Sequence, residues 1–578
     1  MTRRREFVAS CLSSGFLSAA GPALLAQDAV KTADDRTIVG SSKKGVVATV
    51  HPIASKAAMD AFYRGGNAID AAAAASLMLS VVDGFNSGIG GGCLILIRTP
   101  EGQVHAIDGR EKAPALAKPE MFYRAGKPDP SLSQTGPLAA GVPGLLSALD
   151  RITSAHGKLA MKESFAAASA VAREGFAIDE NYFRRLSSAA SRLRQFPSSA
   201  KVLLDSQGKP LPVGHRLQQP DLARTFRKLE EDGVDWFYQD EFARRTEEHL
   251  KDQGGLLRAS DFAAYNTVAR SAIESNYRNH RVFGFPPPSS GGIHVSQMLG
   301  MLSQFDVAEI HKQSETKWRH LLLEVMKRAM ADRAYWLGDS DFAKVPKGLL
   351  DETYLKDRAA SIDLDKVTAV KSHGQPPRAD IDLFGKGGHT THLTTADADG
   401  NVIAITQTVN TTFGNKMIVP GTGVVLNNEL DDFSIAPGVR NAFGLLGSEA
   451  NLVAPGKRPL SSMSPTIVLS EKGAPILSCG AAGGPKIITS VLQVLTRVLD
   501  LNQSIDQAIA APRSHHQWSP DTAVCESGMD DTIVEQLAEL GHKTLRIRSA
   551  AVAQGLQIND SEITAASDPR VPSAVATL

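Results

Sequence analysis

Apolar residues along this chain are grouped in short runs, and the spacing within each run predicts both helices and strands. The stretch 67–82 is rich in alanine and apolar on every side, so it is predicted to be a buried helix. The stretch 487–501 has the spacing of an amphipathic helix. Residues 402–409 and 465–469 are short, apolar runs that are typical of buried strands. Together these runs predict an α+β fold in which helices cover stacked sheets.

The stretch 383–414 is the most informative part of the pattern, because it predicts a loop followed by a hairpin. Three glycines between 385 and 388 lead into a threonine-dense apolar run that starts at Thr390. Asp399-Gly400 is a strong turn signal, since glycine accepts the positive φ that a tight turn needs. Residues 402–409 then return as the second strand.

Thr390 has two interpretations from the residues alone. Threonines at 390, 391, 394 and 395 are good strand formers, and that is what most threonines in such a run are. Alternatively, the Thr390 hydroxyl attacks the carbonyl of His389, and the resulting ester is cleaved by water. The new N-terminal threonine then carries a hydroxyl nucleophile and an α-amine, whose reference pKa of about 7.7–8 suits a general base.

The remaining parts of the chain predict structure more than chemistry. Residues 140–260 are mainly helical by pattern, and 361–388 are polar and rich in glycine and proline, which we interpret as a mobile tail. The glycine cluster at 88–92 lacks the Gly-Lys-Ser/Thr ending of a phosphate loop and precedes a strand. Ser289 and Ser290 are best explained by a turn that enters a helix.

Residues 1–27 are interpreted as a cleavable export signal. Arg3, Arg4 and Arg5 precede a weakly apolar run that ends in small residues near Ala26, and Arg4-Arg5 fits the twin-arginine pattern. The alternative is a membrane anchor, but glycines, a proline and four serines make this run a poor membrane span. We therefore expect a periplasmic protein without a stable membrane span.

Composition excludes some classes of partner. Lys+Arg and Asp+Glu balance at 62 each, so the chain has no net charge that would attract nucleic acid or an acidic membrane. Cys11 would leave with the signal, and Cys93, Cys479 and Cys525 have neither disulfide nor metal spacing. The adjacent pair His515-His516 would point to opposite faces of a strand. We expect no metal and no cofactor.

Four sequence blocks together resemble one known family. They are Thr-Thr-His at 390–392, Asn-Thr-Thr-Phe-Gly at 410–414, Leu-Asn-Asn-Glu-Leu-Asp-Asp-Phe at 426–433 and Arg-Pro-Leu-Ser-Ser-Met-Ser-Pro-Thr at 458–466. In this order they resemble the γ-glutamyltransferases, which are self-cleaving N-terminal-nucleophile hydrolases that act on glutathione. The resemblance extends from about residue 40 to the C-terminus.

The resemblance implies a fold and a maturation. It implies a four-layer αββα sandwich of the N-terminal nucleophile hydrolase type. Cleavage between His389 and Thr390 would divide the chain into a large fragment, 28–389, and a small fragment, 390–578, which form the sandwich jointly as a heterodimer.

The resemblance also implies a role for particular residues. Thr390 is the expected nucleophile, Thr408 its hydrogen-bond partner, and Gly483 and Gly484 the oxyanion hole; glycine suits that role because it lets backbone N–H groups approach the oxyanion. The expected substrate-binding residues are Arg110, Ser461 and Ser462 for the α-carboxylate, Asp432 for the α-ammonium with help from Glu429, and Asn410 close to the substrate. Residues 437–451 resemble a lid loop in which Phe443 replaces a frequent tyrosine.

These roles predict a γ-glutamyl hydrolase or transferase that forms a threonyl ester and passes the acyl group to water or to an amino acid or dipeptide. The alternative on the same scaffold is a cephalosporin acylase that cleaves glutaryl groups. Asp432 discriminates between them, because an acyl group without an α-amine has no use for that carboxylate. A third hypothesis, from a different class, is an uncleaved binding or scaffold protein.

Overall fold

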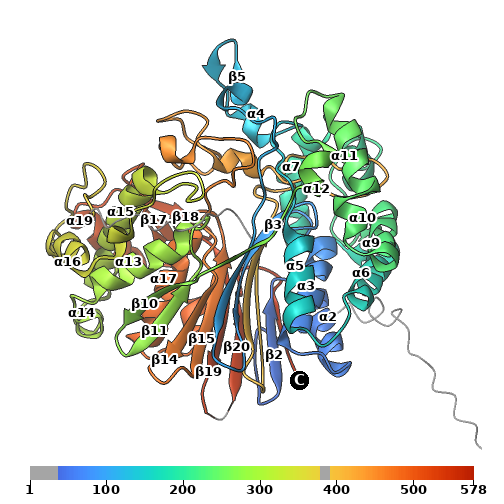
Figure 1. Cartoon of the computed structure of the whole chain (residues 1–578). Helices are drawn as coiled ribbons and strands as arrows, with labels where there is room; N and C mark the ends of the chain where they lie inside the picture. The colour runs from blue at the N-terminus through green and yellow to red at the C-terminus, as the bar shows by residue number, and fades with distance from the viewer. Residues whose placement is uncertain (1–36, 378–390, 561) are drawn as a thin grey trace, which may run out of the picture.

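Two large antiparallel sheets form the centre of the molecule (Figure 1). The structure is a computed structural model, and it describes residues 37–377, 391–560 and 562–578. In the first sheet the order is β1 (Val39–Ser42), β20 (Ile563–Ser567), β19 (Val552–Ile558), β15 (Pro475–Ala482), β14 (Thr466–Ser470), β11 (His280–Gly284) and β10 (Ile273–Tyr277). In the second it is β21 (Ala574–Thr577), β2 (Gly45–Thr49), β12 (Thr391–Asp397), β13 (Val402–Thr408), β3 (Gly92–Arg98), β4 (Val104–Gly109) and β9 (Val268–Arg270). The α+β class predicted from the pattern is confirmed.

The predicted hairpin is the pair β12 and β13. Its register pairs Thr391 with Gln407, and the turn contains Gly400 with a φ of 90°. Asp397 closes the turn, because its Oδ1 accepts the Asn401 N–H at 3.0 Å. Both strands are fully buried, since β13 also pairs with β3 and β12 with β2. The apolar, β-branched sequence of 402–409 follows from this central position.

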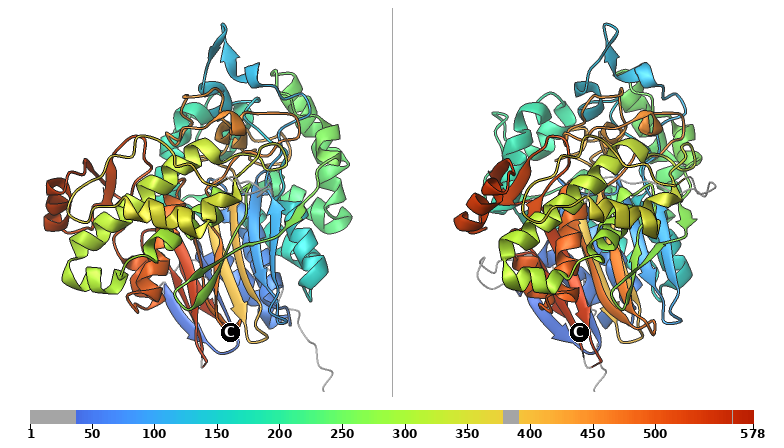
Figure 2. Two further views of the ribbon diagram at one scale, coloured as in Figure 1. Left: turned by 60° about the vertical axis from the view of Figure 1, so that its left-hand side comes forward. Right: turned by 90° about the vertical axis from the view of Figure 1, so that its left-hand side faces the viewer.

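Helices lie on the outer faces of the two sheets. Helix α3 (Ala68–Val82) packs against β12, and α17 (Lys486–Leu499) packs against β15. Asn67 caps α3 in a capping box with Asp70, and every residue of this helix is buried, as its pattern predicted. Figure 1 places α2 (Pro52–Tyr63), α3 and α5 (Leu145–His156) on one side of the strands and α13 (Ser290–Leu302), α15 (Glu315–Trp336) and α16 (Glu352–Ala360) on the other. The turned views of Figure 2 show the same two groups flanking the sheets.

The predicted helical region 140–260 is confirmed. After α5 come the helices α6 (Lys162–Glu174), α7 (Glu180–Leu193), α8 (Pro197–Leu203), α9 (Pro220–Asp232), α10 (Asp235–Tyr238), α11 (Glu241–Lys251) and α12 (Ala259–Ala263). Helix α6 packs against α3 and α9 packs against α6, and the group shares one apolar core with the outer face of the second sheet. A separate apolar layer fills the space between the two sheets, with Leu94, Leu96 and Ala404 meeting Phe283 and Ile467.

The interpretation of 361–388 as a mobile tail is wrong for its described part, 361–377. The backbone carbonyl of Val370 accepts from Trp518 Nε1 at 2.8 Å, and the Val367 N–H donates to the Leu540 carbonyl at 2.8 Å. This polar segment is held in place by hydrogen bonds of its backbone groups and not by an apolar face. The rest of the segment lies outside the described residues.

Other predictions concern parts that the structure describes only in part. The export signal at 1–27 lies outside the described residues. Within the described ranges no helix combines the length and apolar character needed to cross a bilayer. Cys93, Cys479 and Cys525 are buried free thiols.

Candidate active site

The predicted cleavage site and nucleophile, His389 and Thr390, lie outside the described residues. The described chain resumes at Thr391, the first residue of β12. Its hydroxyl donates to Asp83 Oδ2 at 2.7 Å, which ties the start of β12 to the end of α3. Burial raises the pKa of Asp83 to about 7, and the hydrogen bond from Thr391 opposes that rise.

Thr408 and Asn410 form a local unit at the end of β13. Thr408 follows Gln407, the partner of Thr391 in the hairpin. Its Oγ1 accepts the Asn410 N–H at 2.7 Å, and Asn410 Nδ2 donates to the Asn428 carbonyl at 2.8 Å. Asn410 has a φ of 74° in this turn. The unit therefore connects the end of β13 to the loop that carries the acidic block.

Gly483 and Gly484 lie between the end of β15 and the start of α17. Their φ values are 150° and 67°, which favour glycine. A Cβ on Gly483 would lie 2.8 Å from the Ala550 carbonyl oxygen and 2.9 Å from Ala551 Cα. Among the described residues, neither glycine donates its N–H to an acceptor. Two unpaired backbone donors at the end of a strand are what an oxyanion hole requires.

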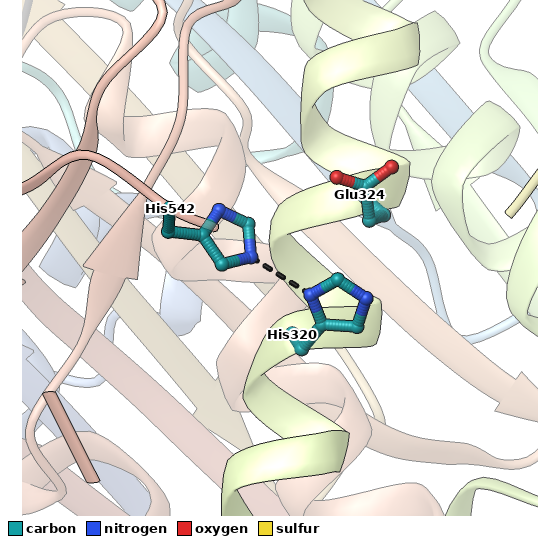
Figure 3. Close-up of side chains that lie close together, drawn as sticks. All are labelled: His320, Glu324 and His542. Carbon is teal, nitrogen blue, oxygen red and sulfur yellow. Dashed lines mark hydrogen bonds between the residues drawn. The ribbon is translucent and has the colours of Figure 1, made fainter. Parts of the chain in front are cut away.

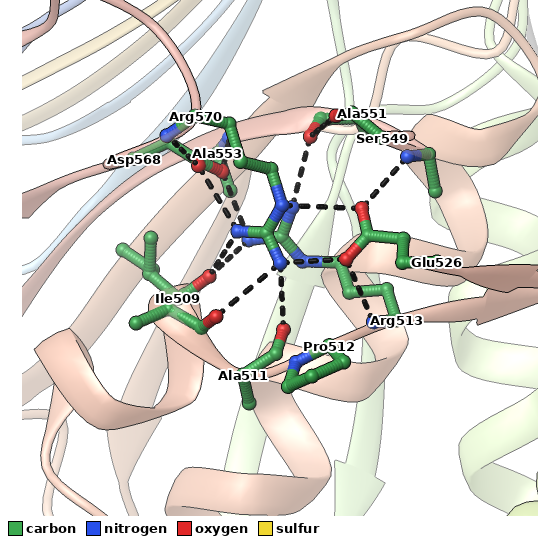
Figure 4. A network of polar contacts seen from close by, with 12 residues as sticks. Ile509, Ala511, Pro512, Arg513, Glu526, Ser549, Ala551, Ala553, Asp568 and Arg570 are labelled. Atoms are coloured by element: carbon green, nitrogen blue, oxygen red, sulfur yellow. Dashed lines mark hydrogen bonds and ion pairs between the residues drawn. The ribbon is translucent and has the colours of Figure 1, made fainter. Parts of the chain in front are cut away.

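A polar network of Arg513, Glu526 and Arg570 holds the segment that contains Ala551 (Figure 4). Arg513 Nη1 donates to the Ala551 carbonyl at 2.9 Å, and Glu526 Oε1 accepts the Ala550 N–H at 2.7 Å. Arg570 joins this network through Glu526, at 2.6 Å. Arg513 and Glu526 thus fix the backbone of Ala550 and Ala551, against which Gly483 packs.

His392 brings β12 and β15 together between the sheets. A Cβ on Gly480 would overlap the imidazole, so the absence of a side chain there lets the strands approach. The ring contacts Thr406 Oγ1 through Nδ1 at 3.0 Å. Burial lowers the pKa of His392 to about 3, so the ring is neutral at neutral pH. The start of β12 and the end of β15 therefore belong to one end of the sandwich.

A buried cluster of charges contains three of the predicted substrate-binding residues. Arg110 follows β4, and its Nη2 donates to Asp432 Oδ2 at 2.9 Å while Nη1 donates to Glu429. Nη1 also meets Glu111 Oε2 at 3.3 Å, and Nε donates to the Pro459 carbonyl at 3.2 Å. The Arg110 side chain has no exposed surface. The structure thus brings Arg110, Glu429 and Asp432 together, with Glu111 as a member that the sequence did not indicate.

Charge in this cluster is unbalanced, because three carboxylates surround one guanidinium. Burial raises the pKa of Glu111 to about 7, and it also raises the pKa values of Glu429 and Asp432, although Arg110 opposes each shift. Burial has this effect because it removes water from the charged form, and it does so here even though Arg110 bonds Glu429 and Asp432 directly. An ammonium group placed beside these carboxylates would favour their charged form.

Asp431 and Asp432 are adjacent but have different surroundings. Asp431 accepts from Ser133 Oγ at 2.6 Å and from the Ala442 N–H at 2.9 Å, so it holds the lid-like loop 437–451. Asn441 Nδ2 of the same loop reaches Asp432 Oδ1 at 3.3 Å. The loop therefore lies directly against the acidic block.

Ser461 and Ser462 contact Ser290 and Arg333, for which the sequence did not indicate a role in the site. The Ser461 carbonyl accepts the Ser290 N–H at 3.0 Å, and Arg333 of α15 donates through Nη2 to Ser462 Oγ at 3.3 Å. Arg333 also donates through Nε to Ser290 Oγ at 2.9 Å. Ser289 caps α13, as the turn interpretation predicted. The sequence did not single out Arg333 as a site residue, because it is one of several basic residues in a long helix.

One group of side chains outside this site has the composition of a metal centre (Figure 3). His320, Glu324 and His542 offer ligand atoms within 4.8 Å of one another. His320 Nε2 donates to a carbonyl, so its Nδ1 is free to accept from His542 Nε2, at 2.8 Å. Glu324 is already paired with Lys327 and Arg328, both at 2.7 Å. The positive charges of Lys327 and Arg328 disfavour a metal ion at this position. The hydrogen bond between His320 and His542 instead joins α15 to the C-terminal part of the chain.

Comparison with known proteins identifies the family. The model of the family described as Gamma-glutamyltranspeptidase matches residues 54–578. The chain belongs to the γ-glutamyltranspeptidase family. The glutathione hydrolase proenzyme of Escherichia coli (strain K12) is 37% identical over 570 residues, which cover 98% of this chain and 97% of that protein.

Other γ-glutamyltranspeptidase relatives have different names. Acylase ACY 1 proenzyme of Pseudomonas sp. (strain SE83) is 34% identical and covers 89% of each chain. The crystal structure of cephalosporin acylase from Bacillus halodurans superimposes with a TM-score of 0.83 at 25% identity, covering 94% of this chain and 97% of that one. Family membership therefore leaves the acyl group open, and the site must decide it.

Proposed function

We propose that this protein is a γ-glutamyltransferase and glutathione hydrolase that activates itself by cutting its chain between His389 and Thr390. The observation that carries the choice of acyl group is the buried cluster in which Glu111, Glu429 and Asp432 share Arg110. Its carboxylates complement an α-ammonium, which a γ-glutamyl group has and a glutaryl group lacks. The name proenzyme among the glutathione hydrolase relatives supports self-cleavage.

The proposed reaction begins at Thr390. Its hydroxyl attacks the γ-glutamyl amide carbonyl, and its own α-amine accepts the hydroxyl proton. The carbonyl electrons move to oxygen, where the N–H groups of Gly483 and Gly484 stabilise the oxyanion; a donor of this kind is worth about 3–4 kcal/mol in other enzymes. Collapse breaks the amide bond, and the leaving amine takes the proton. Water, an amino acid or a dipeptide then attacks the γ-glutamyl ester.

Thr408, Asn410 and the serines have supporting roles in this proposal. Thr408 holds the nucleophile by a hydrogen bond, while Asn410 lies near the bound substrate. Ser461 and Ser462 belong to the end that receives the α-carboxylate. The contacts of Ser462 with Arg333 support this, because they place a cation beside that hydroxyl.

The finer features of the fold belong to the same proposal. The sandwich would be of the N-terminal nucleophile hydrolase type, with four αββα layers formed jointly by fragments 28–389 and 390–578. Export through the 1–27 segment would bring the protein to the periplasm. The arginine pair and the weakly apolar run that follows it support export.

A cephalosporin acylase remains the second candidate, because relatives with acylase names match nearly the whole chain. Steady-state kinetics on γ-glutamyl-p-nitroanilide and glutaryl-p-nitroanilide separate the two. We expect kcat/KM to favour the γ-glutamyl anilide, and a dipeptide acceptor to raise the rate if transfer competes with hydrolysis. A preference for the glutaryl anilide would replace the proposed function by the acylase, and no turnover of either would reject both.

A further inference from the structure

The short segment 83–87, which follows α3, contacts both strands of the central hairpin. Asp83 accepts the Thr391 hydroxyl at 2.7 Å, at the start of β12. Three residues later, the Asn86 carbonyl accepts the Val409 N–H at 3.0 Å, directly after β13. One segment therefore binds the residue that follows Thr390 and the residue that follows Thr408 in the chain.

The segment 83–87 is itself fixed by hydrogen bonds. Asn86 Nδ2 donates to Asp83 Oδ1 at 3.1 Å, and the Asp83 carbonyl accepts the N–H groups of Asn86 and Ser87 at 2.9 and 3.2 Å. Ser87 Oγ also accepts from Gln407 Nε2 at 3.0 Å, and Gln407 is the partner of Thr391 across the hairpin. Asp83 is 3% exposed and Thr391 is fully buried. Water therefore does not replace the bond between them when it is lost.

Side chains of β12 alternate between two surroundings. Thr391 is bonded at the end of α3, and Thr395 donates to the Ala68 carbonyl at the start of that helix, at 2.7 Å. His392 lies on the opposite face, against Gly480 of β15. In an extended chain, a side chain held against α3 has neighbours directed toward β15. A nucleophile that must reach the end of β15 therefore requires that the residue after it stay on the α3 side.

We propose that Asp83 is a positioning residue for the threonine nucleophile. It holds Thr391 against α3, while Asn86 of the same segment holds the end of β13. The two proposed catalytic threonines adjoin these held positions, so the contacts fix one relative to the other. The inference rests on the proposed function and adds a group that touches neither the substrate nor the reacting atoms. Misplacing a reacting group by about 1 Å can cost about 100-fold in rate.

Two substitutions remove the contact, one from each side. Asp83→Ala and Thr391→Val should each lower kcat on γ-glutamyl-p-nitroanilide about 10- to 100-fold and keep KM within about 3-fold. Each precursor should also cut itself more slowly in a time course on denaturing gels. The double variant should fall no more than about 3-fold below the weaker single variant, because both changes remove the same hydrogen bond. Asp83→Asn and Thr391→Ser should recover most of the loss, since they restore an acceptor and a hydroxyl donor.

Thr395→Val is the matched control for Thr391→Val. Thr395 lies on the same face of β12 and bonds the same helix at its other end. Its loss should lower the midpoint of thermal unfolding about as much as Thr391→Val does, and keep kcat within about 3-fold. Equal falls in kcat for the two valine variants would overturn the inference. So would a change confined to KM, or wild-type kcat and self-cleavage in both Asp83→Ala and Thr391→Val.

Failure of the proposed function would give a different result. A wild type that turns over only glutaryl-p-nitroanilide would reject the γ-glutamyl activity, and the same comparison would then be made on that compound. A variant that stays uncut but unfolds in one thermal transition supports the inference, provided that Thr395→Val is cut. If Asp83→Ala does not fold, Thr391→Val decides the test, because valine keeps the shape of the threonine side chain.

Discussion

At the scale of single residues, the site depends on glycines that let backbones approach and on buried charges that share partners. Gly483 is an example of such a glycine, and Asp432 is an example of such a buried charge. Both residues were indicated by their sequence blocks, and so was Arg110, the partner of Asp432. The neighbours of Gly483 were not indicated, since Ala550 and Ala551 approach it from a distant segment.

Gly483→Ala should abolish most activity. The new methyl group would meet the Ala550 carbonyl at 2.8 Å, so the backbone must shift and the N–H donor moves with it. Loss of one oxyanion donor lowers kcat by about 10²–10³-fold in other enzymes. Gly473→Ala is the control, because Gly473 has a φ of 84° but no atom within 4 Å of the added methyl. That variant should lose thermal stability and keep its kcat; an equal fall in kcat would remove Gly483 from the oxyanion hole.

Asp432→Asn should reduce recognition of the α-ammonium. Removing one partner of a desolvated charge pair costs about 2–5 kcal/mol, so kcat/KM for glutathione should fall about 30- to 3,000-fold. The loss on a glutaryl anilide should be much smaller, because that substrate has no ammonium. Self-cleavage should continue, since it involves no free glutamyl group.

Asp431→Asn is the matched control for Asp432→Asn. Asp431 bonds Ser133 and the backbone of the lid-like loop, not Arg110. Its loss should loosen the loop and change both substrates alike. If Asp432→Asn also affects both substrates equally, Asp432 has a structural role and the preference for a γ-glutamyl group loses its main support.

At the scale of elements, the parts that local pattern determines were predictable. The alanine-rich run became α3 and the β-branched run became β13, because apolar character on every side requires burial on every side. Helix α15 was harder, since Arg319, Arg328 and Arg333 are buried although their sequence suggests a basic surface face. Each of them bonds groups distant in the sequence. The contacts of 361–377 were missed for the same reason.

The junction of α3 and β12 predicts a pH dependence. Asp83 has a folded pKa of about 7, above its reference value of 3.8, because it is buried. Its contribution to stability is therefore present below pH 3.8 and is lost as the pH rises through 7. Asp83→Asn keeps an acceptor for Thr391 without the charge. It should be more stable than the wild type at pH 8, by up to about 4 kcal/mol, and this advantage should vanish near pH 4.

Glu324→Gln should show the opposite slope in the same thermal denaturation series. Hydrogen bonds from Lys327, Thr368 and Arg328 overcome the effect of burial and lower the pKa of Glu324 to about 2. Its contribution is present above its reference pKa of 4.5 and is lost as the pH falls through 2. Glu324→Gln should thus be destabilised at neutral pH and less so in acid. Parallel slopes in the two variants would contradict this account of both groups.

At the scale of the whole molecule, the strand order was beyond the reach of the sequence pattern. Ser42 pairs with Ile563, and Ser41 contacts Thr564 across 523 positions of the chain. No local signal encodes such a pairing, because the hydrophobic pattern fixes which faces are buried but not which strands are neighbours. The site follows the same rule, since its acidic block, its serines and Arg333 meet only through the packing of the two sheets and their helices.

This strand order predicts how the cut protein behaves. Cleavage before Thr390 would leave β2, β3, β4 and β9 in one fragment and β12, β13 and β21 in the other, although all belong to one sheet. Separation would expose unpaired edges and the apolar layer between the sheets, so the fragments should elute as one complex under native conditions. A denaturing gel should show two bands, and the sequence of the smaller fragment should begin Thr-Thr-His-Leu.

Thr390→Ala should remain one band and be inactive. Thr395→Ala, in the same strand but bonded to the Ala68 carbonyl, should be cut normally. A different start for the small fragment, or cleavage of Thr390→Ala, would remove Thr390 from its proposed role.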